Sequence, residues 1–246
     1  LVQAVVREKL TAEQRKKWAE VAVRTVEHAY PRGAHDHRNW EQCAMLTPHA
    51  LIVAESAEQA EVALEKAAEL WNQVGVYMEQ AAECDLASVY FSRALQIFET
   101  TCGADDHNIA TVLNNLGNVL RAMGDFEGAR NNLERALKIN ETIDGHDHPI
   151  VAKRLSNLGA VLCDMREFED AKKKLERALK INEDFRGPAH PDVATNLNNL
   201  ARVLHEMHDF QGAKASYERA LQIDGEVHGR NHLYLSIDLN NLGCLL

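Results

Sequence analysis

The sequence predicts an all-α fold, a right-handed superhelical solenoid of antiparallel helix pairs that follows a non-repeating helical segment. The main observation is internal similarity at a step of 42 residues, from about residue 66 to residue 246. A second is composition, because only 13 Gly and 5 Pro in 246 residues favour long helices. A third is apolar spacing of three and four residues, which marks one buried face per helix. We expect a helical segment over 1–65, then four helix pairs and one final helix over 66–246.

The first helix is predicted to begin with a capping box. Thr11 is followed three residues later by Gln14, and together they can satisfy the free N–H groups at a helix start. The helix is expected to run towards Tyr30 and to end at Pro31.

The rest of the N-terminal segment carries two further signals. A polar loop is expected over 34–39, and Thr47 before Pro48 predicts another helix start, with Thr47 as the cap. Three apolar side chains are expected to help bury this end of the solenoid: Trp18, Trp40 and Leu46.

Each later unit contains two motifs at fixed spacing. The first, Asn/Ser-Asn-Leu-Gly/Ala, occupies 114–117, 156–159, 198–201 and 240–243. The second, Glu-Arg-Ala-Leu-Lys/Gln-Ile, occupies 134–139, 176–181 and 218–223. Small residues of these motifs, such as Gly159, are expected where two helices cross closely. Gly-x-x-His-Pro sequences separate units at 145–149 and 187–191, where Gly can end one helix and Pro can begin the next. A weaker copy of the unit lies upstream, with Gly75, Ala87, Phe91, Ala94 and Leu95.

These positions resemble the tetratricopeptide repeat, whose pattern is Trp, Leu, Gly and Tyr in one helix and Ala, Phe and Ala in the next. The resemblance covers about 66–246, and the sequence at 190–200 is similar to repeats of kinesin light chains and their prokaryotic relatives. The unit at 106 departs from it, with Asp-His-Asn in place of His-Pro-Asp, so its preceding turn is expected to differ. The resemblance implies a protein-interaction module that holds a peptide or protein segment in a concave groove.

The N-terminal segment has a looser resemblance. Residues 1–7, the helix of Trp18 and residues 46–50 resemble the connection between the winged-helix region of NB-ARC/STAND ATPases and their C-terminal repeats. This implies an alternative function, the sensor or autoinhibitory arm of a signal-transducing ATPase. The chain contains no Gly-x-x-x-x-Gly-Lys-Ser/Thr loop, so the nucleotide domain would lie outside it.

The resemblance also indicates groove positions on the first helix of each pair, and two columns there carry amides, apart from Ser156 in the first. The first column is residues 72, 114, 156, 198 and 240, and the second is the residue after each of them. Asn is a mediocre helix former, but an amide offers donors and an acceptor to a peptide backbone. The same side chains could instead bond between adjacent repeats, and both interpretations stay open. The groove candidates are Asn72, Gln73, Asn114, Asn115, Asn118, Arg121, Lys153, Asn157, Asn198, Asn199, Arg202, His205, Asn240 and Asn241.

Charge and residue chemistry disfavour other functions. A net charge of −10 disfavours nucleic acid and anionic membranes as partners. Five dispersed cysteines indicate reduced thiols and a cytoplasmic protein, and no apolar stretch is long enough to span a membrane. His35, His37, His146 and His148 lack a ligand cluster, and no nucleophile–base spacing suggests catalysis. We therefore expect no enzyme activity, no metal and no cofactor.

Both ends of the chain suggest a longer protein. The first residue is Leu1. Residues 232–246 provide only the first helix of a fifth unit, whose apolar face would lack a partner helix. We expect either a longer native chain or end-to-end contact between copies.

Overall fold

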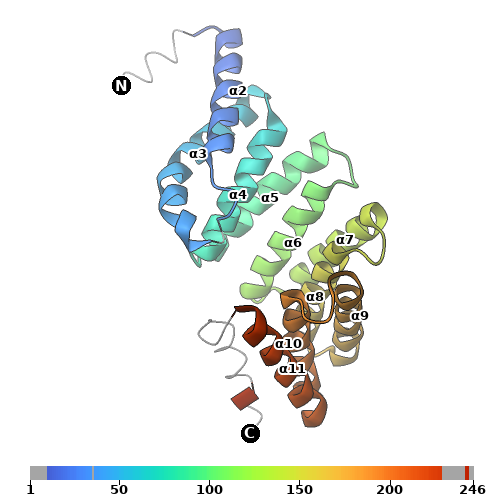
Figure 1. Cartoon of the computed structure of the whole chain (residues 1–246). Coiled ribbons are helices and arrows are strands. Elements are labelled where there is room, and N and C mark those ends of the chain that lie inside the picture. The colour runs from blue at the N-terminus through green and yellow to red at the C-terminus, as the bar shows by residue number, and fades with distance from the viewer. Residues whose placement is uncertain (1–9, 35, 229–241, 244–246) are drawn as a thin grey trace. The chain divides into compact units, whose positions relative to one another are not determined.

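The computed structural model describes residues 10–34, 36–228 and 242–243, and this part of the chain is helical without strands (Figure 1). It forms two compact units, Leu1–Asp125 and Phe126–Leu246. The all-α prediction is confirmed, whereas the predicted boundary after residue 65 stays a prediction. The elements are α2 (Ala12–Ala29), η1 (His37–Asn39), α3 (Trp40–Ala60), α4 (Leu64–Gln80), α5 (Cys84–Thr101), α6 (His107–Ala122), α7 (Phe126–Asp144), α8 (Pro149–Asp164), α9 (Phe168–Arg186), α10 (Pro191–Glu206) and α11 (Phe210–His228).

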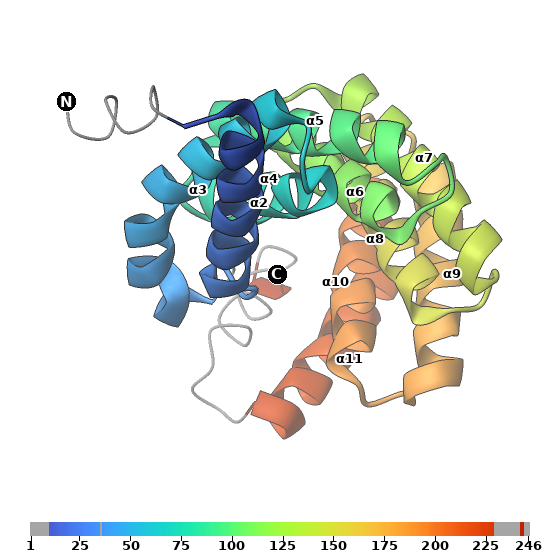
Figure 2. The same ribbon diagram turned by 90° about the horizontal axis from the view of Figure 1, so that it is seen from above.

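In the first unit, neighbouring helices pack consecutively from α2 to α6 (Figures 1 and 2). α2 contacts α4 as well as α3, so the segment before the repeats adds one more helix pair to the stack. The core side chains of the unit include Val23, Tyr30, Trp71, Phe91 and Leu113.

In the second unit, α8 pairs with α9 and α10 pairs with α11, and each pair packs on the next. The close crossing of α8 and α9 depends on Gly159, because a Cβ there would lie 2.6 Å from Leu175 Cγ. The prediction that small residues mark helix crossings is confirmed at this glycine. Gly75 has the same role in the first unit, where a Cβ would lie 2.7 Å from Phe91 Cε1.

The helix starts explain the His-Pro motif. His148 and His190 are N-caps whose Nδ1 atoms accept from the N–H groups two residues on, at 3.2 and 3.1 Å. The proline after each stands in the first turn, where its missing N–H leaves no bond unmade. In the repeat that begins near residue 106, the N-cap is Asp106, whose side chain accepts from Asn108 N at 2.7 Å. The expected difference in this turn is therefore a change of capping side chain.

Two expectations for the N-terminal segment are wrong. Thr47 and Pro48 do not start a helix, because η1 and α3 begin earlier and Pro48 lies inside α3. The Thr47 hydroxyl instead donates to Cys43 O at 2.7 Å and lies 3.0 Å from the Tyr30 hydroxyl. Trp18 and Trp40 do not bury this end, since they are 60% and 40% exposed. The predicted capping box at Thr11 and the helix to residue 29 are confirmed.

The predicted final helix over 232–246 falls mostly outside the described residues, as do Asn240 and Asn241. The predicted end-to-end contact between copies rests on the same segment.

Candidate peptide-binding site

Each unit contains a pocket at the same place in the repeat. In the second unit a pocket of about 720 Å³ lies between α8, the end of α9 and the start of α10. In the first unit a pocket of about 420 Å³ lies between α4, the end of α5 and the start of α6. Eight lining residues of the smaller pocket stand two 42-residue repeats before lining residues of the larger: Lys66, Glu69, Asn72, Gln73, Phe98, Asn108, Thr111 and Val112. The pockets are therefore a product of the repeat.

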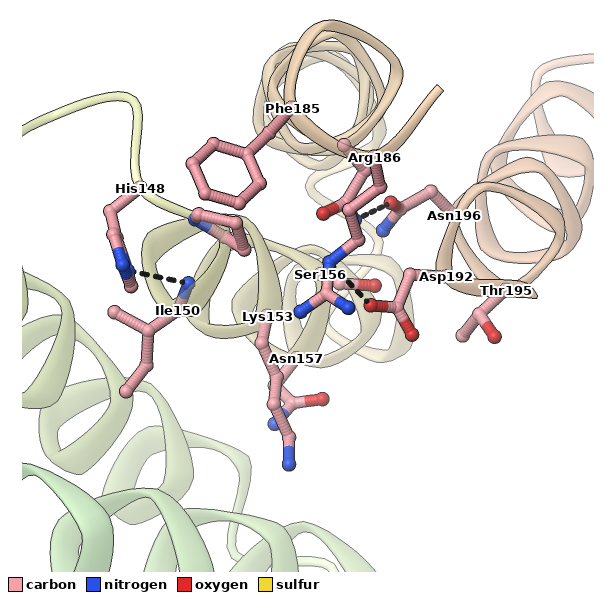
Figure 3. Close-up of a pocket in the computed structure, with 12 residues that line it drawn as sticks. His148, Ile150, Lys153, Ser156, Asn157, Phe185, Arg186, Asp192, Thr195 and Asn196 are labelled. Carbon is pink, nitrogen blue, oxygen red and sulfur yellow. Dashed lines mark hydrogen bonds and ion pairs between the residues drawn. The ribbon is translucent and has the colours of Figure 1, made fainter. Parts of the chain in front are cut away.

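The larger pocket combines an apolar edge with charged groups (Figure 3). Phe185 is 65% exposed and makes an edge-on contact with the His148 ring, with centroids 5.9 Å apart. Arg186 Nε lies 3.2 Å from Asp192 Oδ2. Lys153 is exposed and makes no ion pair within the described residues. Two cations and one carboxylate give the lining an excess positive charge, in contrast to the chain as a whole.

Buried amides lie at the base of this pocket. Asn182 and Asn196 are 3% and 2% exposed, and Asn182 Nδ2 donates to Asn196 Oδ1 at 2.6 Å. One repeat earlier the same two positions hold Asn140 and Arg154, where Arg154 Nε donates to Asn140 Oδ1 at 2.9 Å. Burial lowers the pKa of Arg154 to about 10, against the opposing effect of nearby Asp144. A polar pair thus joins α7 to α8 and α9 to α10.

The predicted amide columns bond between adjacent repeats. Asn115 Nδ2 donates to Asn72 Oδ1 at 3.1 Å, and Asn199 Nδ2 donates to Ser156 Oγ at 3.0 Å. In both cases the second column of one repeat reaches the first column of the repeat before it. These bonds supply the structural role that the sequence left open. The column residues that the structure describes are half-buried or buried, and their role in ligand binding stays a prediction.

The remaining groove candidates divide between pockets and structural contacts. Lys153 and Asn157 line the larger pocket, and Asn72 and Gln73 line the smaller one. Other candidates lie on the first helices outside the two pockets: Asn114, Asn115, Asn118, Arg121, Asn198, Asn199, Arg202 and His205.

Among these outer candidates, Arg202 and His205 contact neighbouring helices. Arg202 Nη1 donates to Asp164 Oδ1 at 2.9 Å, and its Nη2 donates to Ala160 O at 3.1 Å, so this guanidinium ties α10 to α8. The His205 ring packs edge-on against Phe210, with centroids 5.6 Å apart.

Sequence reasoning missed the side chains that α9 contributes to the pocket. Phe185 and Arg186 stand at the end of α9, the second helix of its pair, whereas the groove candidates lie on first helices. A signal existed in the repeat, because apolar residues recur at a step of 42 at Ile143, Phe185 and Val227. The structure shows that all three are exposed. An exposed apolar residue that recurs in register suggests a functional surface.

The described part of the chain contains no cluster of three or more His, Cys, Asp or Glu side chains suited to a metal ion. None of its helices is long and apolar enough to cross a membrane.

Comparison with known proteins assigns the family. A tetratricopeptide repeat model matches residues 66–142, 108–181, 151–226 and 192–246. The chain belongs to the tetratricopeptide repeat family. Repeats of this family are typically non-catalytic scaffolds, in agreement with the prediction that the chain is not an enzyme. Among curated protein sequences, none matches the chain.

Solved structures agree with a tetratricopeptide fold of the kinesin-light-chain type. BtubC (BKLC) from P. vanneervenii is 22% identical with a TM-score of 0.63, over 91% of this chain and 95% of that one. A putative kinesin light chain of Podospora anserina with nearly identical repeats is 15% identical with a TM-score of 0.67, over 83% and 95%. The apo form of RapI is 18% identical with a TM-score of 0.68, over 82% and 71%. At these identities the likeness concerns the fold.

Proposed function

We propose that this tetratricopeptide repeat protein binds an extended peptide segment of a partner along the first helices α8 and α10 of the second unit, with the larger pocket receiving one side chain. The observation that carries the proposal is the pocket between α8, α9 and α10, which combines exposed Phe185 with the exposed cation of Lys153. Small sites that bind specifically join an apolar surface to a few placed polar groups. The smaller pocket in the same register supports a repeated mode of recognition.

The amide columns have a supporting part in this proposal. Their bonds between repeats fix the side chains and so pre-organise the surface that a peptide would meet. An ordered amide retains acceptor capacity beyond a single hydrogen bond, so structure and binding do not exclude each other.

The test uses a displayed library of random 12-residue peptides selected on the full chain. Peptides that bind are expected to lose affinity for a Phe185→Ala, Lys153→Ala double variant by about tenfold or more. Both side chains are exposed, so the melting temperature should not change. Lys173→Ala is the matched control, because Lys173 is an exposed lysine on α9 that does not line the pocket. Selected peptides that bind the double variant as tightly as the wild type would contradict the proposal.

A second proposal, that the chain is the sensor or autoinhibitory arm of a STAND ATPase, rests on the N-terminal segment. The family model begins at residue 66, after this segment, and α2 and α3 nevertheless pack on the repeats. The gene sequence upstream of Leu1 tests it. A phosphate-binding loop there would support the ATPase arm, and an initiation codon directly before Leu1 would contradict it.

A further inference from the structure

A separate groove lies between α2 and α3 in the first unit, and it shares no lining residue with the two candidate peptide pockets. It has a volume of about 580 Å³, and Figures 1 and 2 show the two helices side by side. The groove is lined by Leu10, Ala12, Arg15, Lys16, Trp18, Ala19, Ala22, Val53, Ser56, Gln59 and Ala60.

The groove carries an exposed tryptophan. Trp18 is 60% exposed, whereas Trp71 in the core is 1% exposed. Residues 11–18 are all exposed, so the first turns of α2 lack the cover that its later turns receive. Trp18 shares the groove with the apolar side chains of Leu10 and Val53. An exposed tryptophan in an apolar groove indicates an interaction surface, and tryptophan is the residue most often found at the energetic centre of one.

The charge of the groove is opposite to that of the chain. Arg15 and Lys16 are the ionised side chains in the lining, and neither makes an ion pair within the described residues. The whole chain carries a net charge of −10. A local basic site on an acidic protein favours an acidic partner, because complementary charge steers association and suppresses wrong partners.

The shape of the groove fits a helix. Small residues recur along α2 at Ala12, Ala19 and Ala22, and along α3 at Ser56 and Ala60. Small side chains let a third helix approach closely, and the α2 stretch from 12 to 22 spans roughly 15 Å, or about three helical turns. Trp18 then stands where an apolar side chain of that helix would pack.

We propose that the groove between α2 and α3 binds an acidic amphipathic helix of a partner protein. Apolar side chains of the partner pack against Trp18 and Val53, and flanking carboxylates pair with Arg15 and Lys16. A protein helix is favoured over an anionic bilayer because the site is concave. The chain's own residues 1–9 have the wrong charge for the site, since Arg7, Glu8 and Lys9 sum to one positive charge.

The experiment uses the full chain and a labelled synthetic 18-residue helix with Leu at i, i+3, i+4 and i+7 and Glu beside them. Binding is followed by fluorescence anisotropy at ~150 mM salt, where charges beyond about 8 Å are screened. A second peptide with Lys in place of every Glu is the comparison. We expect the acidic peptide to bind at least about tenfold more tightly than the lysine peptide.

Matched variants locate the site. Trp18→Ala should weaken binding of the acidic peptide at least about tenfold and Lys16→Glu about fivefold. Val21→Ala and Lys17→Glu are the controls, because these exposed residues of α2 do not line the groove, and each should change the affinity less than about twofold. Circular dichroism melts confirm that each variant is folded.

Four results would overturn the proposal. One is equal affinity for the two peptides, and another is an unchanged affinity in the folded Trp18→Ala variant. A third is binding to phosphatidylserine vesicles without binding to the acidic peptide, which would identify a membrane surface. The fourth is self-association without peptide that Trp18→Ala abolishes, which would identify a second copy as the occupant.

Discussion

In each repeat, one position in the turn between the two helices has a left-handed backbone conformation. Ala82, Gly124, Arg166 and His208 stand 42 residues apart and have φ of 62°, 83°, 64° and 64°. At each, the following N–H bonds back to a carbonyl of the last helical turn, as from Glu167 to Leu162 O at 2.9 Å. Glycine thus adopts this backbone conformation in one repeat, and residues with a Cβ adopt it in the other three.

Arg166→Gly and His208→Gly should therefore stabilise the protein. A Cβ in this conformation is unfavourable, and its removal outweighs the greater freedom of glycine in the unfolded chain, for an expected gain of about 0.5–1 kcal/mol per site. The measurement is urea unfolding at 25 °C. Met165→Gly is the control, because Met165 has φ −77° and glycine there should destabilise the protein. A loss of stability at both Arg166 and His208 would contradict the argument.

Ion pairs connect successive second helices in the second unit. Arg177 Nη1 lies 2.6 Å from Glu141 Oε1, and Arg219 Nη2 lies 2.6 Å from Glu183 Oε1. Each pair spans 36 residues, so the same contact recurs one repeat later. Burial alone would raise the pKa of Glu141, but hydrogen bonds from Arg177 and His146 lower it below its usual range.

Glu141→Gln should destabilise the protein at pH 7 and not at acid pH. Because the folded-state pKa lies below 4.5, the pair contributes fully above that pH and its contribution is lost as the pH falls through the lowered pKa. We expect a loss of about 1 kcal/mol at pH 7. Urea unfolding of variant and wild type at pH 7 and pH 3 measures it, with Glu176→Gln in an exposed pair of α9 as the control. A difference that persists unchanged at pH 3 would show that the charge of Glu141 is not its cause.

Local spacing predicted the elements, but contacts between elements were harder to predict. The capping box at Thr11 is contained within four residues and could be identified directly. Thr47-Pro48 matches a helix start equally well, yet its context is the middle of α3, where Thr47 bonds to Cys43 O and packs near Tyr30. The hydroxyl partner 17 residues away cannot be inferred from a four-residue pattern.

The candidate site shows the same limit. Lys153 and Asn157 were placed by the repeat, because first helices share one register. Phe185 comes from the second helix, and only the crossing of α9 over α8 and α10 brings it to the pocket. The bond from Asn199 to Ser156 joins residues 43 apart, so the sequence could only suggest a contact between repeats, and the packed structure was needed to identify its partner.

At the scale of the whole molecule, net charge governs the response to polyanions. The chain carries 37 acidic and 27 basic residues, and DNA binding requires a basic surface that releases counterions. The ion pairs of Arg177 and Arg219 occupy guanidinium groups that would otherwise contact phosphate. The lysine run 172–174 is partly neutralised too, since Lys172 and Lys173 lie near Glu176 and Asp170.

We therefore expect no binding of a 30-base-pair duplex at up to ~10 µM protein in 50 mM salt, conditions that favour electrostatic binding. An electrophoretic mobility shift assay measures it. The basic groove of α2 and α3 does not change this expectation, because two cations release too few counterions to overcome repulsion from a net charge of −10. A shift that disappears at 200 mM salt would show that a basic surface dominates over the net charge. If Lys16→Glu also removed that shift, the groove itself would be the anion site, and its preference for an acidic helix would have to be measured in competition with DNA.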